Sequence, residues 1–344
     1  MIRSAPTSTS SGPSTRTSMA VHLDVGPVES GTAAPPGGPS AAPRRQGDDS
    51  RAPEARGTGP GDPPAHSPGG TTMPFFTGSH GRVHHEAWLP DGAAERVVVL
   101  LHGYGEHLGL YGPLVRRLVA DGAAVHALDA MGHGRSDGER AVLDWDGWVD
   151  DARQLTDLAR DRHPGRPVVL VGHSAGGLAA YLLALRSPGT ADGLVLSGAP
   201  LRRQEWVEAV LADGPEEEVA DVDPSEVFST HPGYVHALLH DPLTWHGGFR
   251  PEMLRALVRA WPEAAAGLAQ GLPDLPVLFV HGEDDPVVPV ADSRASAAQL
   301  PQARVVTFPG DLHDVLNEHD RDRVHEVVAG FVAARTEIRA TAPV

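Results

Sequence analysis

"VVLVGHSAGGLAAYLLAL", residues 168–185, is the stretch that decides the fold. Four apolar residues lead to a glycine, a serine follows two positions later, and an alanine-rich run begins at once. A buried strand that turns sharply into a helix exposes the residue at the turn, and this arrangement presents a nucleophile. Glycines on either side would avoid collisions in so tight a turn. We therefore predict that Ser174, between Gly172 and Gly176, is a nucleophile.

The pattern G-x-S-x-G occurs twice, so its context has to separate the two copies. Gly134–Gly138 forms the second copy around Ser136. Ser136 lies well after the preceding apolar run and is followed by "GERAV", which is charged and does not start a helix of small residues. We expect Ser136 to have a role in loop structure.

Apolar runs alternate with amphipathic ones along most of the chain. Strands are expected within 95–103, 123–134, 167–174, 193–200, 275–285 and 303–313, and helices within 111–122, 145–165, 175–189, 290–300 and 322–335. Continuously apolar strands that alternate with helices predict an α/β fold, a mostly parallel sheet with helices on both faces. In such sheets the reactive loops lie at the carboxyl ends of the strands.

Two segments depart from this pattern. Residues 1–72 are rich in Ser, Thr, Pro, Gly and Ala with little to bury, which predicts a disordered tail. Residues 201–272 contain helical pieces and the acidic run "PEEEVADVD" but no convincing buried strand. We expect a core domain of residues 73–200 and 273–338, with residues 201–272 inserted as a helical cap over the site.

A serine nucleophile needs a base and an acid that orients the base. In this architecture both follow the serine, on loops after later strands. The last strand is followed by His313, which we predict to be the base, while Glu283, Asp284 and Asp285 follow the strand before it. His319 and His325 lie on or near the final helix and are expected to face solvent.

Acyl transfer also needs donors for the developing oxyanion. The amide of Ala175 follows the nucleophile at the start of a helix, and the loop "LLHGYGEH" is expected to supply the second donor. Gly103 and Gly105 would let that backbone approach closely, and the amide of Tyr104 is the predicted donor. His102 is expected to brace the loop.

Charge and composition exclude several classes of protein. Residues 1–72 are neutral, so the net charge of −17 resides in the remainder and disfavours nucleic-acid partners. There is no cysteine, and the 19 histidines are scattered, so neither a metal nor a cofactor is expected. No apolar stretch reaches the ~20 residues of a membrane span, and no signal core is present. These features predict a cytoplasmic protein without membrane insertion.

The motifs together resemble the α/β-hydrolase superfamily, and within it the monoacylglycerol lipases, lysophospholipases and serine aminopeptidases. The similarity is carried by "LLHGYGEHLGLYGPL", "ALDAMGHGRSDGER", "VGHSAGG", "HDPLTWHG", "VHGEDDPVVP" and "PGDLHDVLNE". The resemblance implies Ser174, Asp285 and His313 as the triad, with Tyr104 and Ala175 as oxyanion donors. It thereby favours Asp285 over Asp284. Tyr104 is larger than is usual at its position, so its side chain is expected to narrow or roof an acyl pocket.

The substrate expected from this resemblance is a single-chain acyl ester such as a monoacylglycerol. An aminopeptidase is the first alternative, with Glu216, Glu217 and Glu218 holding a free amine, although a solvated loop explains that run better. A haloperoxidase-like activity of the same triad is a minor alternative. A non-catalytic binding protein of this fold is expected to lack a triad member, and none is missing.

Overall fold

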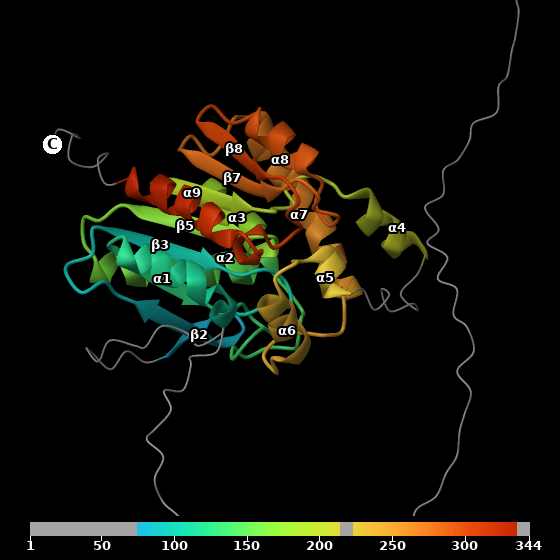
Figure 1. Cartoon of the computed structure of the whole chain (residues 1–344), viewed down its shortest axis with the longest axis horizontal. Coiled ribbons are helices and arrows are strands. Elements are labelled where there is room, and N and C mark those ends of the chain that lie inside the picture. The colour runs from blue at the N-terminus through green and yellow to red at the C-terminus, as the bar shows by residue number, and fades with distance from the viewer. Residues whose placement is uncertain (1–73, 214–222, 336–344) are drawn as a thin grey trace, which may run out of the picture. The chain divides into compact units, whose positions relative to one another are not determined.

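A single eight-stranded sheet organises the residues that the computed structural model describes, 74–213 and 223–335 (Figure 1). The strand order is β1-β2-β4-β3-β5-β6-β7-β8, and β2 runs antiparallel to β1 and β4 while the other neighbours are parallel. The strands are β1 (Phe75–Gly78), β2 (Gly81–Trp88), β3 (Arg96–Leu101), β4 (Ala123–Leu128), β5 (Val168–His173), β6 (Gly193–Ser197), β7 (Val277–Gly282) and β8 (Ala303–Phe308). The predicted mostly parallel sheet is confirmed.

Helices cover both faces of this sheet, as predicted. One face carries α1 (Gly112–Ala120) and α9 (Arg321–Ala333), and the other carries α2 (Trp145–Arg162), α3 (Ala175–Arg186) and α8 (Val290–Ala297). Two short 3-10 helices, η1 (Leu108–Tyr111) and η2 (Val315–Asn317), lie in the loops after β3 and β8.

The strand β3 shows how the sheet divides the core. Val97, Val99 and Leu101 belong to the apolar cluster under α2 and α3, whereas Val98 and Leu100 belong to the cluster under α1 and α9. All five are at most 1% exposed. Alternate side chains of a strand point to opposite faces, so a central strand covered on both sides has to be apolar throughout.

The segment between β6 and β7 is helical in its described part. Residues 201–272, called the inserted segment below, contain α4 (Glu205–Asp213), α5 (Pro224–Val227), α6 (Pro232–His240) and α7 (Pro251–Ala269). In Figure 1, α5 and α6 lie on the side to which the arrowheads of β3 and β5 point. The acidic residues Glu216, Glu217 and Glu218 and the predicted tail fall outside the described residues.

The strands β1 and β2 and the position of His325 were not predicted from the sequence. In β2, His84 and His85 are 3% and 5% exposed. The strand is therefore buried although its sequence is polar, and an apolar pattern does not mark it. The expectation that His325 faces solvent is wrong, since it is 2% exposed and its Nε2 lies 2.8 Å from the carbonyl oxygen of Leu316. This bond satisfies the imidazole inside the core.

A buried histidine in β4 makes the stability of this fold depend on pH. His126 is 0% exposed, and neither ring nitrogen has a hydrogen-bond partner among the described residues. Burial, together with the nearby His163 and Arg162, lowers its pKa to about 3. The unfolded chain takes up this proton near pH 6.5, so the folded state is favoured fully above pH 6.5 and loses that advantage as the pH falls toward 3.

We predict that His126→Leu reduces the acid sensitivity of the protein. Between pH 7.5 and 5.0 the free energy of unfolding of the variant should fall by about 2 kcal/mol less than that of the parent chain. Urea unfolding at both pH values measures this difference. His246→Leu, at an exposed position, is the control and should leave the pH dependence unchanged. An equal loss in the His126 variant and the parent would contradict the assignment.

Candidate active site

Ser174 lies at the turn where β5 passes directly into α3. Its backbone has φ 48° and ψ −119°, a left-handed conformation that a residue with a side chain rarely adopts. The neighbouring glycines permit it. A Cβ on Gly172 would lie 2.3 Å from the carbonyl oxygen of Gly176, and one on Gly176 would lie 2.3 Å from the carbonyl oxygens of Leu101 and His102. The turn therefore tolerates no side chain at either glycine.

Three of the predicted residues converge at this turn. The Nε2 atom of His313 lies 2.8 Å from the Ser174 hydroxyl, and its Nδ1 atom lies 2.8 Å from Oδ2 of Asp285. A carboxylate only accepts hydrogen bonds, so Nδ1 carries the proton and Nε2 directs a lone pair at Ser174. This arrangement can remove the proton of the serine hydroxyl.

The carboxylate of Asp285 is held in the charged form. Burial alone would raise its pKa, but the histidines 313 and 281 beside it hold the pKa well below its ordinary range. Its Oδ1 atom accepts the backbone N–H groups of Val287 and Val288 at 2.8 and 2.9 Å. The neighbouring Asp284 is exposed, and the carboxylate that bonds the imidazole is that of Asp285.

The backbone amides of Ala175 and Tyr104 are the two predicted oxyanion donors. Ala175 begins α3, where the first N–H groups of a helix have no partner within the helix. Within the described residues, neither the N–H of Ala175 nor that of Tyr104 donates to another protein group. An amide at a helix start favours negative charge, so this pair suits a developing oxyanion.

His102 connects the loop after β3 to the loop after β4 by hydrogen bonds. Its Nδ1 atom donates to the carbonyl oxygen of Gly103 at 2.7 Å, and its Nε2 atom accepts the backbone N–H of Ala130 at 2.9 Å. Burial lowers the pKa of this imidazole, which keeps it neutral, as this donor and acceptor pair requires.

Ser136 of the second G-x-S-x-G copy has only structural contacts. Its hydroxyl donates to the carbonyl oxygen of Asp129 at 2.6 Å and accepts the backbone N–H of His84 at 2.9 Å.

A buried polar cluster beside the serine was missed by the reasoning from sequence. Glu106 accepts the hydroxyl groups of Tyr111 and Tyr234, and His173 forms an ion pair with Asp314. Burial alone would lower the pKa of His173, but the carboxylates of Asp314 and Glu106 outweigh it and raise the pKa to about 9. The sequence signal that could have found this cluster is the position of its acids: Glu106 in "GYGEH" and Asp314 in "LHD" both lie close to predicted site residues in the chain.

The same cluster holds the described atoms best placed to bind a metal. One ligand atom each from Glu106, His173 and Asp314 lies within 4.8 Å of the others. The tyrosine hydroxyls and the backbone N–H of Gly103, which donates to Glu106 at 2.7 Å, already fill this site, so the residues act as partners of one another.

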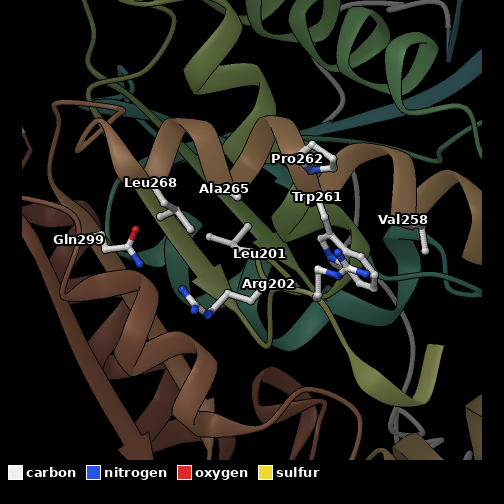
Figure 2. A pocket seen from close by; sticks show the side chains of 9 residues that line it. Leu201, Arg202, Val258, Trp261, Pro262, Ala265, Leu268 and Gln299 are labelled. Carbon is white, nitrogen blue, oxygen red and sulfur yellow. The ribbon is translucent and has the colours of Figure 1, made fainter. Parts of the chain in front are cut away.

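An apolar groove of about 560 Å³ lies between α7, the loop after β6 and the end of α8 (Figure 2). Its lining includes Leu201, Arg202, Trp261, Ala265, Leu268 and Gln299. Ser174, Asp285 and His313 are not among the lining residues, so this groove is separate from the converging side chains.

A mostly parallel sheet with a serine at a sharp strand-to-helix turn is the architecture of the α/β hydrolases. A family profile described as "Serine aminopeptidase, S33" matches residues 92–320. The chain is 35% identical to a monoacylglycerol lipase of Mycolicibacterium smegmatis, over 75% of this chain and 96% of that protein. The chain belongs to the S33 serine aminopeptidase family of α/β hydrolases.

Two further proteins show the range of its relatives. A pimeloyl-[acyl-carrier protein] methyl ester esterase of Xanthomonas oryzae is 29% identical, over 69% of this chain and 95% of that protein. The crystal structure of the monoacylglycerol lipase of Paleococcus ferrophilus superimposes with a TM-score of 0.61 at 25% identity, covering 74% of this chain and 99% of that chain. The family resemblance expected from the motifs is confirmed.

The elbow glycine gives a direct test of the turn. We predict that Gly176→Ala destabilises the protein by about 3 kcal/mol or more, because the new methyl group would meet two backbone carbonyls that cannot move aside. Thermal or urea unfolding measures the loss. Gly330→Ala in α9 is the matched control, since a Cβ there has no neighbour within 4 Å and should be neutral or mildly stabilising. A Gly176 variant as stable as the control would refute the tight approach.

Proposed function

We propose that this chain is a serine hydrolase that cleaves carboxylic esters of a single acyl chain, such as monoacylglycerols, through an acyl-enzyme. The observation that carries the proposal is the imidazole of His313, which lies 2.8 Å from both the Ser174 hydroxyl and the Asp285 carboxylate. The named activities of the relatives, a monoacylglycerol lipase and a methyl ester esterase, support the choice of an ester.

The reaction proceeds in two halves. In the first, the Ser174 oxygen attacks the ester carbonyl while His313 takes the hydroxyl proton, and the amides of Tyr104 and Ala175 stabilise the oxyanion. The bond to the alcohol then breaks, and His313 returns its proton to the departing oxygen. In the second half a water molecule gives a proton to His313 and attacks the acyl group. The bond between the acyl group and Ser174 then breaks, His313 returns the proton to the serine oxygen, and the carboxylic acid is released. Asp285 holds the imidazole tautomer throughout.

The inserted segment is proposed to act as a cap over this site, on a core of residues 73–200 and 273–338. It contacts the loop that carries His313, because the backbone N–H of Asp314 donates to the carbonyl oxygen of Phe228 at 2.7 Å. Within the described residues no helix is long and apolar enough to cross a membrane. The cytoplasmic location and the absence of nucleic-acid partners stay predictions.

An aminopeptidase is the second candidate, favoured by the description of the family profile. The acidic residues that would hold a free amine, Glu216 to Glu218, lie outside the described residues. The three side chains in bonding geometry disfavour a binding protein without catalysis.

Labelling with a fluorophosphonate probe tests the nucleophile. We expect the parent chain to be labelled and Ser174→Ala to be unlabelled, with esterase kcat/KM reduced by roughly 10³-fold or more. The matched control is Ser136→Ala, which removes the serine of the other G-x-S-x-G copy and should still be labelled. Labelling that survives in the Ser174 variant, or that never occurs, would reject the proposal.

Hydrolysis of model substrates tests the bond that is cleaved. We expect p-nitrophenyl esters to be hydrolysed with a preference that changes with acyl length, and aminoacyl-p-nitroanilides to be poor substrates. Asp285→Asn should lower kcat by about 10³- to 10⁴-fold on the preferred ester, because the amide no longer enforces the required imidazole tautomer. Faster cleavage of the anilides than of any ester would favour the aminopeptidase instead.

A further inference from the structure

We propose that the inserted segment positions the loop of residues 103–107, called the oxyanion loop below. Four consecutive residues of this loop each form a hydrogen bond with a residue of the inserted segment. The inference rests on the proposed function, because it assigns the purpose of these bonds to the amide of Tyr104. The four bonds join residues 104, 105, 106 and 107 to residues 250, 245, 234 and 241 respectively. Every one of these partners belongs to the inserted segment.

The first bond is made by the side chain of Tyr104. Its hydroxyl accepts the backbone N–H of Arg250 at 3.2 Å and donates to the carbonyl oxygen of Ala141 at 3.0 Å. The ring stacks on Phe249 with centroids 5.6 Å apart. The large side chain expected to narrow an acyl pocket therefore serves to connect the loop to the start of α7.

The second bond joins two backbones. The carbonyl oxygen of Gly105 accepts the backbone N–H of Trp245 at 2.8 Å. Gly105 has a φ of +81°, a conformation that glycine adopts at little cost, so the loop can turn its carbonyl toward the inserted segment.

In the third and fourth bonds the acceptor is a carboxylate. Glu106, 4% exposed, accepts the hydroxyl of Tyr234 from α6. His107 accepts the backbone N–H of Gly109 at its Nδ1 atom, so its Nε2 atom carries the proton and donates to Asp241 at 3.1 Å. Hydrogen bonds to charged groups are stronger than those between neutral groups.

These bonds act on a loop with no helix or strand of its own. Glu106 also accepts the backbone N–H of Gly103 at 2.7 Å, so the carboxylate that holds Tyr234 also closes the turn that contains Tyr104. An oxyanion donor is effective only when it is in place before the charge develops. The tyrosine hydroxyls, the carboxylate of Asp241 and the carbonyl of Gly105 need not touch the substrate, so we assign them a positioning role.

The kinetic consequence separates positioning from substrate binding. Removing a bond that orients the Tyr104 amide should weaken binding of the transition state and leave binding of the ester largely unchanged. We expect Tyr104→Phe and Asp241→Asn each to lower kcat by about 3- to 10-fold, the factor equivalent to one lost hydrogen bond, with KM within about twofold of the parent value.

Both variants keep the shape of the residue that they change. Phenylalanine retains the backbone amide and the stacking ring of Tyr104. Asparagine has one acceptor oxygen where Asp241 has two, so it cannot serve both His107 and the backbone N–H of Leu243, which now donates to Asp241 at 2.8 Å.

A trifluoromethyl ketone with the acyl chain of the best ester reports on the oxyanion directly, since its adduct with serine carries the negative oxygen. We expect its inhibition constant to rise in each variant by the same factor by which kcat/KM falls. Tyr181→Phe is the matched control. It removes a buried tyrosine hydroxyl that lies within α3 and donates to the carbonyl oxygen of Leu272 at 2.7 Å, and within the described residues this tyrosine bonds to no member of the loop. It should lower the melting temperature and leave kcat and the inhibition constant unchanged.

The outcomes separate this inference from the function on which it rests. If the parent enzyme hydrolyses esters, and Tyr104→Phe and Asp241→Asn lower only the melting temperature, as the control does, the bonds are structural and the inference is overturned. A rise in KM with constant kcat would overturn it as well, because the loop would then bind substrate. If the parent chain neither hydrolyses esters nor reacts with the fluorophosphonate, the proposed function itself fails.

Discussion

The close approach of α3 to β3 at the turn after β5 is the constraint on which the rest of the site depends. Gly176 lies so near the carbonyl oxygens of Leu101 and His102 that no side chain fits there. That contact places the free amide of Ala175 beside the loop after β3, and it holds Ser174 in a left-handed conformation. One backbone contact thus holds the turn of the proposed nucleophile against the start of the loop that carries the second proposed oxyanion donor.

The inserted segment contacts the two loops on either side of Ser174. Residues 234–250 hold the oxyanion loop, while Phe228 and Thr230 bond to Asp314 and Glu318 in the loop that carries His313. Loops have few internal hydrogen bonds, so their precision comes from what packs against them. The inserted segment therefore contributes to the geometry of both loops through its hydrogen bonds.

The polar cluster of Glu106, His173 and Asp314 shows how charge is tolerated beside the site. Each of the three residues is at most 4% exposed, and an isolated buried charge would be strongly unfavourable. The histidine forms an ion pair with Asp314 and lies near Glu106, and the hydroxyls of Tyr111 and Tyr234 donate to the oxygens of Glu106. Mutual pairing replaces solvation, and the paired residues connect the proposed oxyanion loop, the serine turn and the loop that carries His313.

The sequence by itself determined the parallel sheet, and it predicted Ser174 and His313 as site residues from loop order, because apolar periodicity and small residues at a turn are local signals. Asp285 was preferred over Asp284 partly through the family resemblance, since adjacent acids on one loop are hard to separate by sequence. Only the tertiary structure decided that His325 and the histidines of β2 are buried, and that Tyr104 bonds to Arg250. Polar partners distant in the chain leave no periodic pattern, so their pairing exists only once the fold has brought them together.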